Sequence, residues 1–243
     1  MKSGQSGQSG QWVAVVPVKG NPGAKSRLGD RPDRPRLADA FALDTVAAVL
    51  AAPRVGRVLV VTADDALAAR LAALGAEIVL EAAVPEAAVP ATEPAAGEGS
   101  GESARPPADP MNAAIRQGLT AARTRFPRAN LLVLTGDLPA LTPADVEQAL
   151  ALAAGHERSM VPDAAGTGTT TLLALAGVPV EPRFGPGSRA AHEAAGHVPL
   201  EIPPAAGIRS DVDTAADLLV AERLGLGAHT RPLVAADPAS IWR

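Results

Sequence analysis

The stretch Leu131-Leu-Val-Leu-Thr-Gly-Asp137 carries the strongest fold signal in this chain. Its apolar run is short and ends at a glycine, which predicts a buried β-strand over residues 131–135. Gly136 permits a tight exit from that strand, and Pro139 stiffens the loop that follows. Asp137 is therefore predicted to lie where the strand ends and the loop opens.

A second acidic segment, Asp211-Val212-Asp213, lies near the C-terminus. In an extended backbone, residues two apart point to the same side, so both carboxylates would face one way. If the fold brings them to Asp137, three carboxylates would repel one another unless a cation bound between them. Mg²⁺, which proteins hold with a few carboxylates and substrate phosphates, fits that description. The simpler alternatives are an aspartate that caps a turn and charge at a helix N-terminus.

The composition is that of an α/β domain. The chain has 243 residues, of which 47% are hydrophobic but only 2% aromatic. Its core is therefore expected to consist of Ala, Val and Leu, which suits helices packed on a mostly parallel sheet.

Several protein classes are excluded by the same numbers. The net charge of −4 argues against a general nucleic-acid surface. No apolar run approaches the ~20 residues of a membrane span. The absence of cysteine excludes disulfides, thiolate zinc sites and cysteine nucleophiles. A cytoplasmic location is expected because the N-terminus lacks the apolar core of a signal peptide.

Strands and helices are expected to alternate along the chain. The expected strands are residues 12–18, 58–62, 76–80, 131–135, 159–162 and 172–175. The expected helices are residues 35–52, 64–74, 111–125 and 189–195, with further helices that start at Thr142 and Thr214. This alternation predicts a doubly wound α/β sheet, which binds ligands at the C-terminal ends of its strands.

The domain is expected to cover residues 12–227. Residues 1–11 repeat Ser-Gly-Gln and are interpreted as a disordered expression linker. Residues 81–110 are rich in Pro, Ala, Glu and Gly without periodicity, which predicts a flexible insertion. Residues 228–243 are interpreted as a C-terminal tail.

Three loops carry candidate binding residues. The first loop contains Lys19, Lys25 and Arg27, whose charges suit a triphosphate, although it matches neither a P-loop nor a Rossmann fingerprint. The segments Gly166–Thr171 and Arg183–Ser188 offer hydroxyl and backbone N–H groups that could form an anion nest for a small phosphorylated acid, or could be two ordinary turns.

Three further polar residues have less specific signals. Asn112, at the start of a predicted helix, could cap that helix or contact a nucleobase or ribose. His192 and His197 lack metal-ligand spacing and are predicted to be incidental to function.

Six motifs, taken in the order in which they occur along the chain, resemble those of the phosphoenolpyruvate or 2-phospho-L-lactate guanylyltransferases of coenzyme F-420 biosynthesis. The resemblance covers about residues 12–227. The matching segments are Val16-Pro-Val-Lys19 with Ala24-Lys-Ser-Arg-Leu28, Pro110-Met-Asn-Ala-Ala-Ile115, Gly136-Asp-Leu-Pro-Ala-Leu141, Pro162-Asp163 with Gly166-Thr-Gly-Thr169, Phe184-Gly-Pro-Gly-Ser188 and Asp211-Val-Asp-Thr214.

This resemblance implies a fold, a reaction and a site. The fold is a nucleotide-diphospho-sugar transferase-like nucleotidyltransferase, with one doubly wound domain and a mostly parallel, mixed sheet. The reaction transfers GMP from GTP to the phosphate of phosphoenolpyruvate, giving enolpyruvoyl-2-diphospho-5'-guanosine and pyrophosphate. The implied site residues are Asp137, Asp211 and Asp213 for Mg²⁺; Thr169, Gly185 and Ser188 for the phosphorylated acid; Lys19, Lys25, Arg27 and Asn112 for GTP; and Asp137, Lys25 and Arg27 for catalysis.

The implied partners are GTP and a phosphorylated three-carbon acid, with no nucleic acid or membrane. Hand-off of the product to the next coenzyme F-420 enzyme is also expected, while a homodimer stays open. The alternatives are the same reaction on 2-phospho-L-lactate or 3-phosphoglycerate, a molybdopterin guanylyltransferase-like enzyme, and a non-catalytic GTP-binding regulator. The first loop lacks the Gly-rich signature expected of the molybdopterin enzymes.

Overall fold

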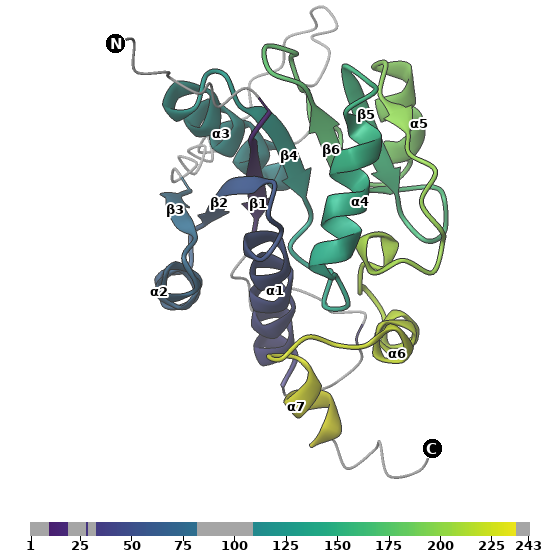
Figure 1. Ribbon diagram of the computed structural model, residues 1–243. Helices are drawn as coiled ribbons and strands as arrows, with labels where there is room; N and C mark the ends of the chain where they lie inside the picture. The colour runs from purple at the N-terminus through teal and green to yellow at the C-terminus, as the bar shows by residue number, and fades with distance from the viewer. Residues whose placement is uncertain (1–9, 19–27, 29–32, 82–108, 237–243) are drawn as a thin grey trace, which may run out of the picture.

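The described part of the chain forms one seven-stranded sheet with the strand order β3-β2-β1-β4-β6-β5-β7 (Figure 1). The computed structural model describes residues 10–18, 28, 33–81 and 109–236. The strands are β1 (Trp12–Pro17), β2 (Val55–Thr62), β3 (Glu77–Leu80), β4 (Asn130–Leu134), β5 (Arg158–Pro162), β6 (Thr169–Ala174) and β7 (Val198–Pro199).

The sheet is mixed but mostly parallel, as predicted. Strand β1 pairs in parallel with β2 and β4, β2 with β3, and β5 with β7. Strand β6 is antiparallel to both of its neighbours, β4 and β5. The C-terminal ends of β1, β4 and β5 therefore meet the N-terminal start of β6 at one edge of the sheet.

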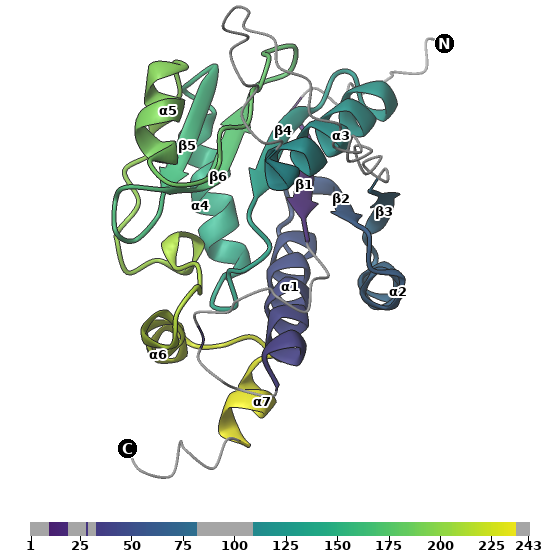
Figure 2. The same cartoon turned by 180° about the vertical axis from the view of Figure 1, so that it is seen from behind.

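Helices cover both faces of this sheet, which Figures 1 and 2 show from opposite sides. The helices are α1 (Arg34–Leu50), α2 (Asp65–Leu74), α3 (Pro110–Arg125), α4 (Pro143–Ala153), α5 (Ser188–Ala194), α6 (Ala215–Leu224), α7 (Arg231–Ala235) and a short 3-10 helix, η2 (Gly207–Arg209). Helices α1, α2 and α4 share one buried cluster with the sheet, and α3 packs against the opposite face in a second cluster.

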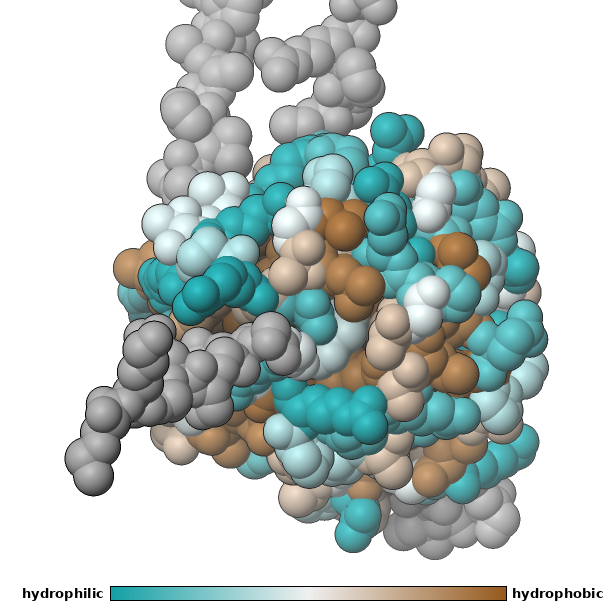
Figure 3. Space-filling view, turned by 45° about the horizontal axis from the view of Figure 1, so that its top comes forward, coloured by the Kyte–Doolittle hydropathy of each residue, from teal (hydrophilic) through white to brown (hydrophobic). Residues whose placement is uncertain are grey.

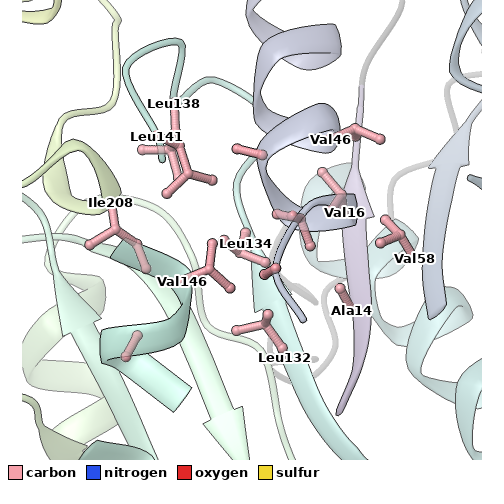
Figure 4. Close-up of a cluster of buried hydrophobic side chains, with 14 of the residues drawn as sticks. Ala14, Val16, Val46, Val58, Leu132, Leu134, Leu138, Leu141, Val146 and Ile208 are labelled. Atoms are coloured by element: carbon pink, nitrogen blue, oxygen red, sulfur yellow. The ribbon is translucent and has the colours of Figure 1, made fainter. Parts of the chain in front are cut away.

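The core on the α1 side continues past the end of the sheet. Leu134 of β4 and Val146 of α4 lie close to Leu138 and Leu141 of the loop after β4 and to Ile208 of η2 (Figure 4). The buried side chains are chiefly Ala, Val and Leu, as the composition predicts. The loop after β4 and helix η2 are therefore anchored by hydrophobic burial.

Two predicted helix starts are confirmed by capping boxes. The Thr142 side chain accepts a hydrogen bond from the Asp145 amide, while the Asp145 carboxylate accepts from the Thr142 amide. Thr214 and Asp217 make the same reciprocal pair at the start of α6. Each pair satisfies backbone N–H groups that a helix N-terminus leaves unbonded.

Some details differ from the sequence predictions. Residues 169–171, predicted as part of a loop, belong to β6, because pairing with β4 and β5 satisfies their backbone groups. The short elements β7, η2 and α7 were not predicted. Helix α3 is capped by Asp109, whose side chain accepts from the amides of Met111 and Asn112, so the capping role considered for Asn112 is wrong.

The segment after residue 227, interpreted as a tail, packs on α1 as far as the structure describes it. Thr230 is fully buried and Val234 nearly so. The buried Asp44 carboxylate of α1 accepts hydrogen bonds from the backbone amides of His229 and Thr230, at 2.9 and 2.8 Å. These contacts make residues 227–236 part of the folded structure.

The described surface carries its exposed large hydrophobic side chains singly, at Leu80, Leu152, Val198 and Val220. On the face shown in Figure 3, hydrophobic patches are interrupted by hydrophilic ones. None of the helices in the described ranges has the length and apolarity needed to cross a membrane.

Candidate active site

Acidic residues from three segments gather at the C-terminal edge of the sheet. Asp137 follows β4, and Asp163 follows β5. The backbone amide of Val212 donates to the carbonyl oxygen of Asp137 at 3.1 Å, which brings the Asp211–Asp213 segment against the loop after β4. The structure thus places the two acidic segments of the sequence side by side.

Two kinds of contact hold the loop that carries Asp137 in place. The amide of Leu138 donates to the Thr45 hydroxyl of α1 at 3.0 Å, and that hydroxyl donates to the carbonyl of Phe41. The Leu138 side chain is fully buried in the cluster that also contains Ile208 (Figure 4). The loop is therefore fixed by hydrogen bonding to α1 and by burial of its leucine.

The pKa of Asp211 reflects its burial first and the negative charge of its neighbours second. Burial, together with the negative charges of Asp137, Asp213 and, more weakly, Asp163, raises the pKa of Asp211 to about 7. A carboxyl group with such a pKa is stabilised as a carboxylate by any cation that binds beside it. The site therefore has the electrostatic character of a cation site.

A pH-dependent stability follows from this raised pKa. Between pH 3.8 and about 7 the folded protein keeps a proton on Asp211 that the unfolded chain has released, so stability falls as pH rises, by at most about 1.4 kcal/mol per pH unit. We expect Asp211→Asn to be more stable relative to wild type at pH 8 than at pH 4. Urea unfolding with EDTA present measures this, and an equal difference at both pH values would refute it.

The donor set fits Mg²⁺ bound through one or two carboxylates. Asp137 and Asp211 are partly buried, whereas Asp213 is exposed and its amide donates to Asp217. Within the described ranges, no three acidic or histidine side chains are grouped closely enough to hold a metal by themselves. Mg²⁺ commonly takes one or two carboxylates and completes its shell with water and phosphate oxygens.

The loop between β5 and β6 is organised by Asp163. Its carboxylate accepts from the amides of Thr167 and Gly168 at 2.9 and 2.8 Å, and its carbonyl oxygen accepts from the Arg209 guanidinium. A Cβ on Gly168 would overlap this carboxylate, so glycine is required there. The loop delivers Thr169, 7% exposed, to the same edge as Asp137.

Two other predicted residues lie where the chain enters α5: Gly185 is in the turn before the helix, and Ser188 is the first residue of the helix. Gly185 and Gly187 have φ angles of +128° and +71°, which L side chains rarely adopt. No heavy atom of the described structure, beyond the immediate chain neighbours, lies within 4 Å of a Cβ built on either glycine. The backbone of this turn is therefore open to close approach by a ligand.

The two glycine-containing segments lie against each other, as the anion-nest prediction requires. The amide of Arg189 donates to the carbonyl of Thr167 at 3.3 Å, and its guanidinium donates to the carbonyl of Gly166 at 3.0 Å. Thr169, Gly185 and Ser188 therefore belong to one region of the structure. Their role in binding the acid stays a prediction.

Asn112 has structural partners. Its side-chain amide donates to the carbonyl of Phe184, and its side-chain oxygen accepts from the amide of Phe184, both at 2.9 Å. This pair fastens α3 to the turn before α5. The other predicted GTP residues, Lys19, Lys25 and Arg27, lie outside the described residues.

Sequence reasoning missed several residues that build this site. Thr45 and Arg209 act through backbone partners distant in sequence, and no short motif reveals such contacts. Asp163 binds the amides of Thr167 and Gly168 within its own loop. His192, predicted to be incidental, has both ring nitrogens hydrogen-bonded within the acceptor region. The Pro162-Asp163 pair beside Gly166–Thr169 was the one available signal for Asp163.

The sequence of this chain is similar to those of known enzymes. No protein-family model matches the chain. It is similar to the phosphoenolpyruvate guanylyltransferases of Streptomyces scabiei (46% identity over 224 residues, 90% of this chain and 94% of the relative) and Streptomyces coelicolor (44% over 229 residues, 93% and 96%). The enzyme of the same name from Thermomonospora curvata is 43% identical over 230 residues, covering 94% and 90%.

Solved structures support the fold. A protein provisionally named nucleotide-diphospho-sugar transferase, from Desulfovibrio desulfuricans G20, aligns with a TM-score of 0.60 and 15% identity over 92% of this chain and 94% of its own. A 4-diphosphocytidyl-2C-methyl-D-erythritol synthase aligns with a TM-score of 0.52 and 14% identity over 88% and 98%. The fold is thus that of the nucleotide-diphospho-sugar transferases, and by its sequence the chain belongs to the phosphoenolpyruvate guanylyltransferase family.

Proposed function

We propose that the protein transfers GMP from GTP to the phosphate group of phosphoenolpyruvate and releases pyrophosphate. The observation that carries this proposal is the meeting, in a chain of this family, of an acidic pair and two Gly/Thr/Ser segments at one edge of the sheet. An enzyme that joins two phosphorylated substrates requires a cation site next to an anion-binding site.

The chemical step needs no protein base. The second pKa of a phosphate monoester is about 6, so the acceptor phosphate is already an anionic nucleophile at neutral pH. One of its oxygens attacks the α-phosphorus of GTP, and the bond from that phosphorus to the oxygen bridging to the β-phosphate breaks. Pyrophosphate leaves with the bonding electrons, and the product is enolpyruvoyl-2-diphospho-5'-guanosine.

The protein's contribution is positioning and charge compensation. Thr169, Ser188 and the backbone of Gly185 bind the acid, and the basic loop with Lys19, Lys25 and Arg27 binds GTP. Lys25 and Arg27 compensate the charge of the leaving pyrophosphate.

Asp137, Asp211 and the more exposed Asp213 would hold Mg²⁺. Bound there, Mg²⁺ would neutralise the charge of the phosphates that the two substrates bring together. The raised pKa of Asp211 and the partial burial of Asp137 and Asp211 support this assignment. The resemblance to the guanylyltransferases of coenzyme F-420 biosynthesis supports a place for the product in that pathway.

The test is pyrophosphate release with GTP, Mg²⁺ and one acid at a time. Phosphoenolpyruvate, 2-phospho-L-lactate and 3-phosphoglycerate are compared side by side, with CTP and EDTA as controls, and the products are identified by mass spectrometry. We expect release with phosphoenolpyruvate that requires GTP and the metal. Turnover confined to another acid would overturn the acceptor assignment, and tight GTP binding without turnover on any acid would favour a regulator.

A further inference from the structure

The His192 side chain hydrogen-bonds to both segments of the predicted acceptor site. Its ring is fully buried in α5. The Nε2 atom lies 3.0 Å from the backbone amide nitrogen of Arg183, at the start of the glycine-containing turn. The Nδ1 atom lies 3.0 Å from the hydroxyl oxygen of Thr169, at the start of β6. One imidazole thus bridges the two segments that are proposed to bind the acid.

The partners determine where the ring carries its proton. A backbone amide can only donate, so Nε2 of His192 must accept from Arg183 and carries no hydrogen. In a neutral imidazole the hydrogen is then on Nδ1, which donates to the Thr169 hydroxyl.

The surroundings keep the ring neutral and fixed. Burial, with the positive charges of His197 and Arg183 nearby, lowers the pKa of His192 to about 4. The Phe184 ring meets the imidazole edge-on at a centroid distance of 5.2 Å, and His197 does so at 5.5 Å. At neutral pH the ring therefore has one protonation state and one orientation.

This tautomer has a consequence for the Thr169 hydroxyl. Because the oxygen accepts from His192, its own hydrogen must point to another group. The other partner in the described structure is the Met160 sulfur, 3.7 Å away and a weak acceptor. A carboxylate or phosphate oxygen of the acid is a much stronger acceptor than a thioether.

We propose that His192 is a positioning residue for the acceptor acid: its Nδ1–H bonds to Thr169 Oγ1 and thereby directs the threonine hydroxyl to donate to the anionic acid. The same ring holds the turn that begins at Arg183 through its Nε2. The assignment rests on the proposed function for the identity of the acid, whereas the tautomer belongs to the ligand-free protein.

The tautomer is measured first, by long-range ¹H–¹⁵N NMR of the wild-type imidazoles at pH 7 without substrate. We expect one histidine, absent from the spectrum of His192→Asn, to show the Nδ1–H neutral form. An Nε2–H form or an imidazolium at His192 would overturn the proposal, whatever the enzyme's activity.

Kinetics then separate positioning from stability. His192→Leu is expected to raise the KM for phosphoenolpyruvate about tenfold, with the KM for GTP changed less than about twofold. His192→Asn keeps an amide near the Nδ1 position and is expected to restore most of the acid affinity. His192→Gln, which reaches the Nε2 position instead, should restore less. In a Thr169→Val background, His192→Asn and His192→Leu should have equal KM values, because the two residues act as one unit.

His197→Phe is the matched control, since His197 is 4% exposed and meets the same ring edge-on. In the described structure its hydrogen bond is to the carbonyl of His192, and none joins it to Thr169 or Arg183. Its acid KM should match wild type. Unchanged acid KM in His192→Leu, or equal rises in His192→Leu and His197→Phe, would overturn the proposal. No turnover by the wild type would overturn the proposed function alone, since the NMR result still decides the tautomer.

Discussion

Replacing Asp137 with asparagine is expected to reduce guanylyl transfer about 10³-fold, which corresponds to about 4 kcal/mol of transition-state stabilisation. The change keeps the size of the side chain and removes the charge that we assign to the metal. Asp137 is positioned by the Val212 amide at its carbonyl and by the adjacent Leu138 amide on Thr45. These contacts use the backbone, so the variant should keep the loop in place. Steady-state pyrophosphate release at saturating GTP and acid measures the loss.

Asp65→Asn is a suitable control for that experiment, because Asp65 is an exposed residue in the first turn of α2. Its activity should stay within about twofold of wild type. Circular dichroism should show that both variants are folded. If folded Asp137→Asn turned over at a rate close to that of the control, the assignment of Asp137 to the metal would be wrong.

Gly207→Ala is expected to destabilise the fold by about 3 kcal/mol. A Cβ on Gly207 would collide with the carbonyl oxygen of Ala140, lie 2.7 Å from its carbonyl carbon, and lie 3.0 Å from Asp145 Oδ2. The Ala140 carbonyl belongs to the backbone of the loop that carries Asp137, so relief requires η2 to move away. Denaturant unfolding measures the loss.

Loss of activity should accompany the loss of stability in this variant. Helix η2 carries Arg209, which holds the loop of Asp163, and it leads directly into Asp211. The control is Gly155→Ala, after α4, where the nearest heavy atom outside the immediate chain neighbours is 3.8 Å from the new Cβ and the backbone has no positive φ. That change should alter stability by less than about 0.5 kcal/mol. Equal stability of the two variants would show that η2 can move without cost.

Much of the fold could be predicted because its elements carry local signals. Apolar runs located six of the strands, and the Thr142 and Thr214 capping boxes located two helix starts. The start of β6 was placed too late because Thr and Gly favour loops as well as strand ends. The reversed direction of β6 and the two-residue β7 depend on pairing partners, which a linear sequence does not contain.

The candidate site was predictable to a smaller degree. The magnesium hypothesis required the Asp211–Asp213 segment to lie beside Asp137, and the two segments are adjacent in the structure. The partners of Asn112 and His192 were not foreseen, because these polar side chains are satisfied by backbone groups up to 72 residues away. Hydrogen bonds of that kind leave no periodic trace in the sequence.

Adjacent residues on α1 also determine when the acidic edge can be completed during synthesis. Thr45 supports the loop of Asp137, and Asp44 binds the amides of His229 and Thr230. The amide of Gly227 adds a hydrogen bond of 2.9 Å to the carbonyl of Pro139 in that same loop. When β4 and the following loop have been synthesised, the C-terminal residues that hydrogen-bond to this loop and to α1 have not yet been made. The acidic edge becomes complete only after residue 230 has emerged from the ribosome. In a nascent chain that stops earlier, the loop of Asp137 lacks the contacts that residues 227–230 supply.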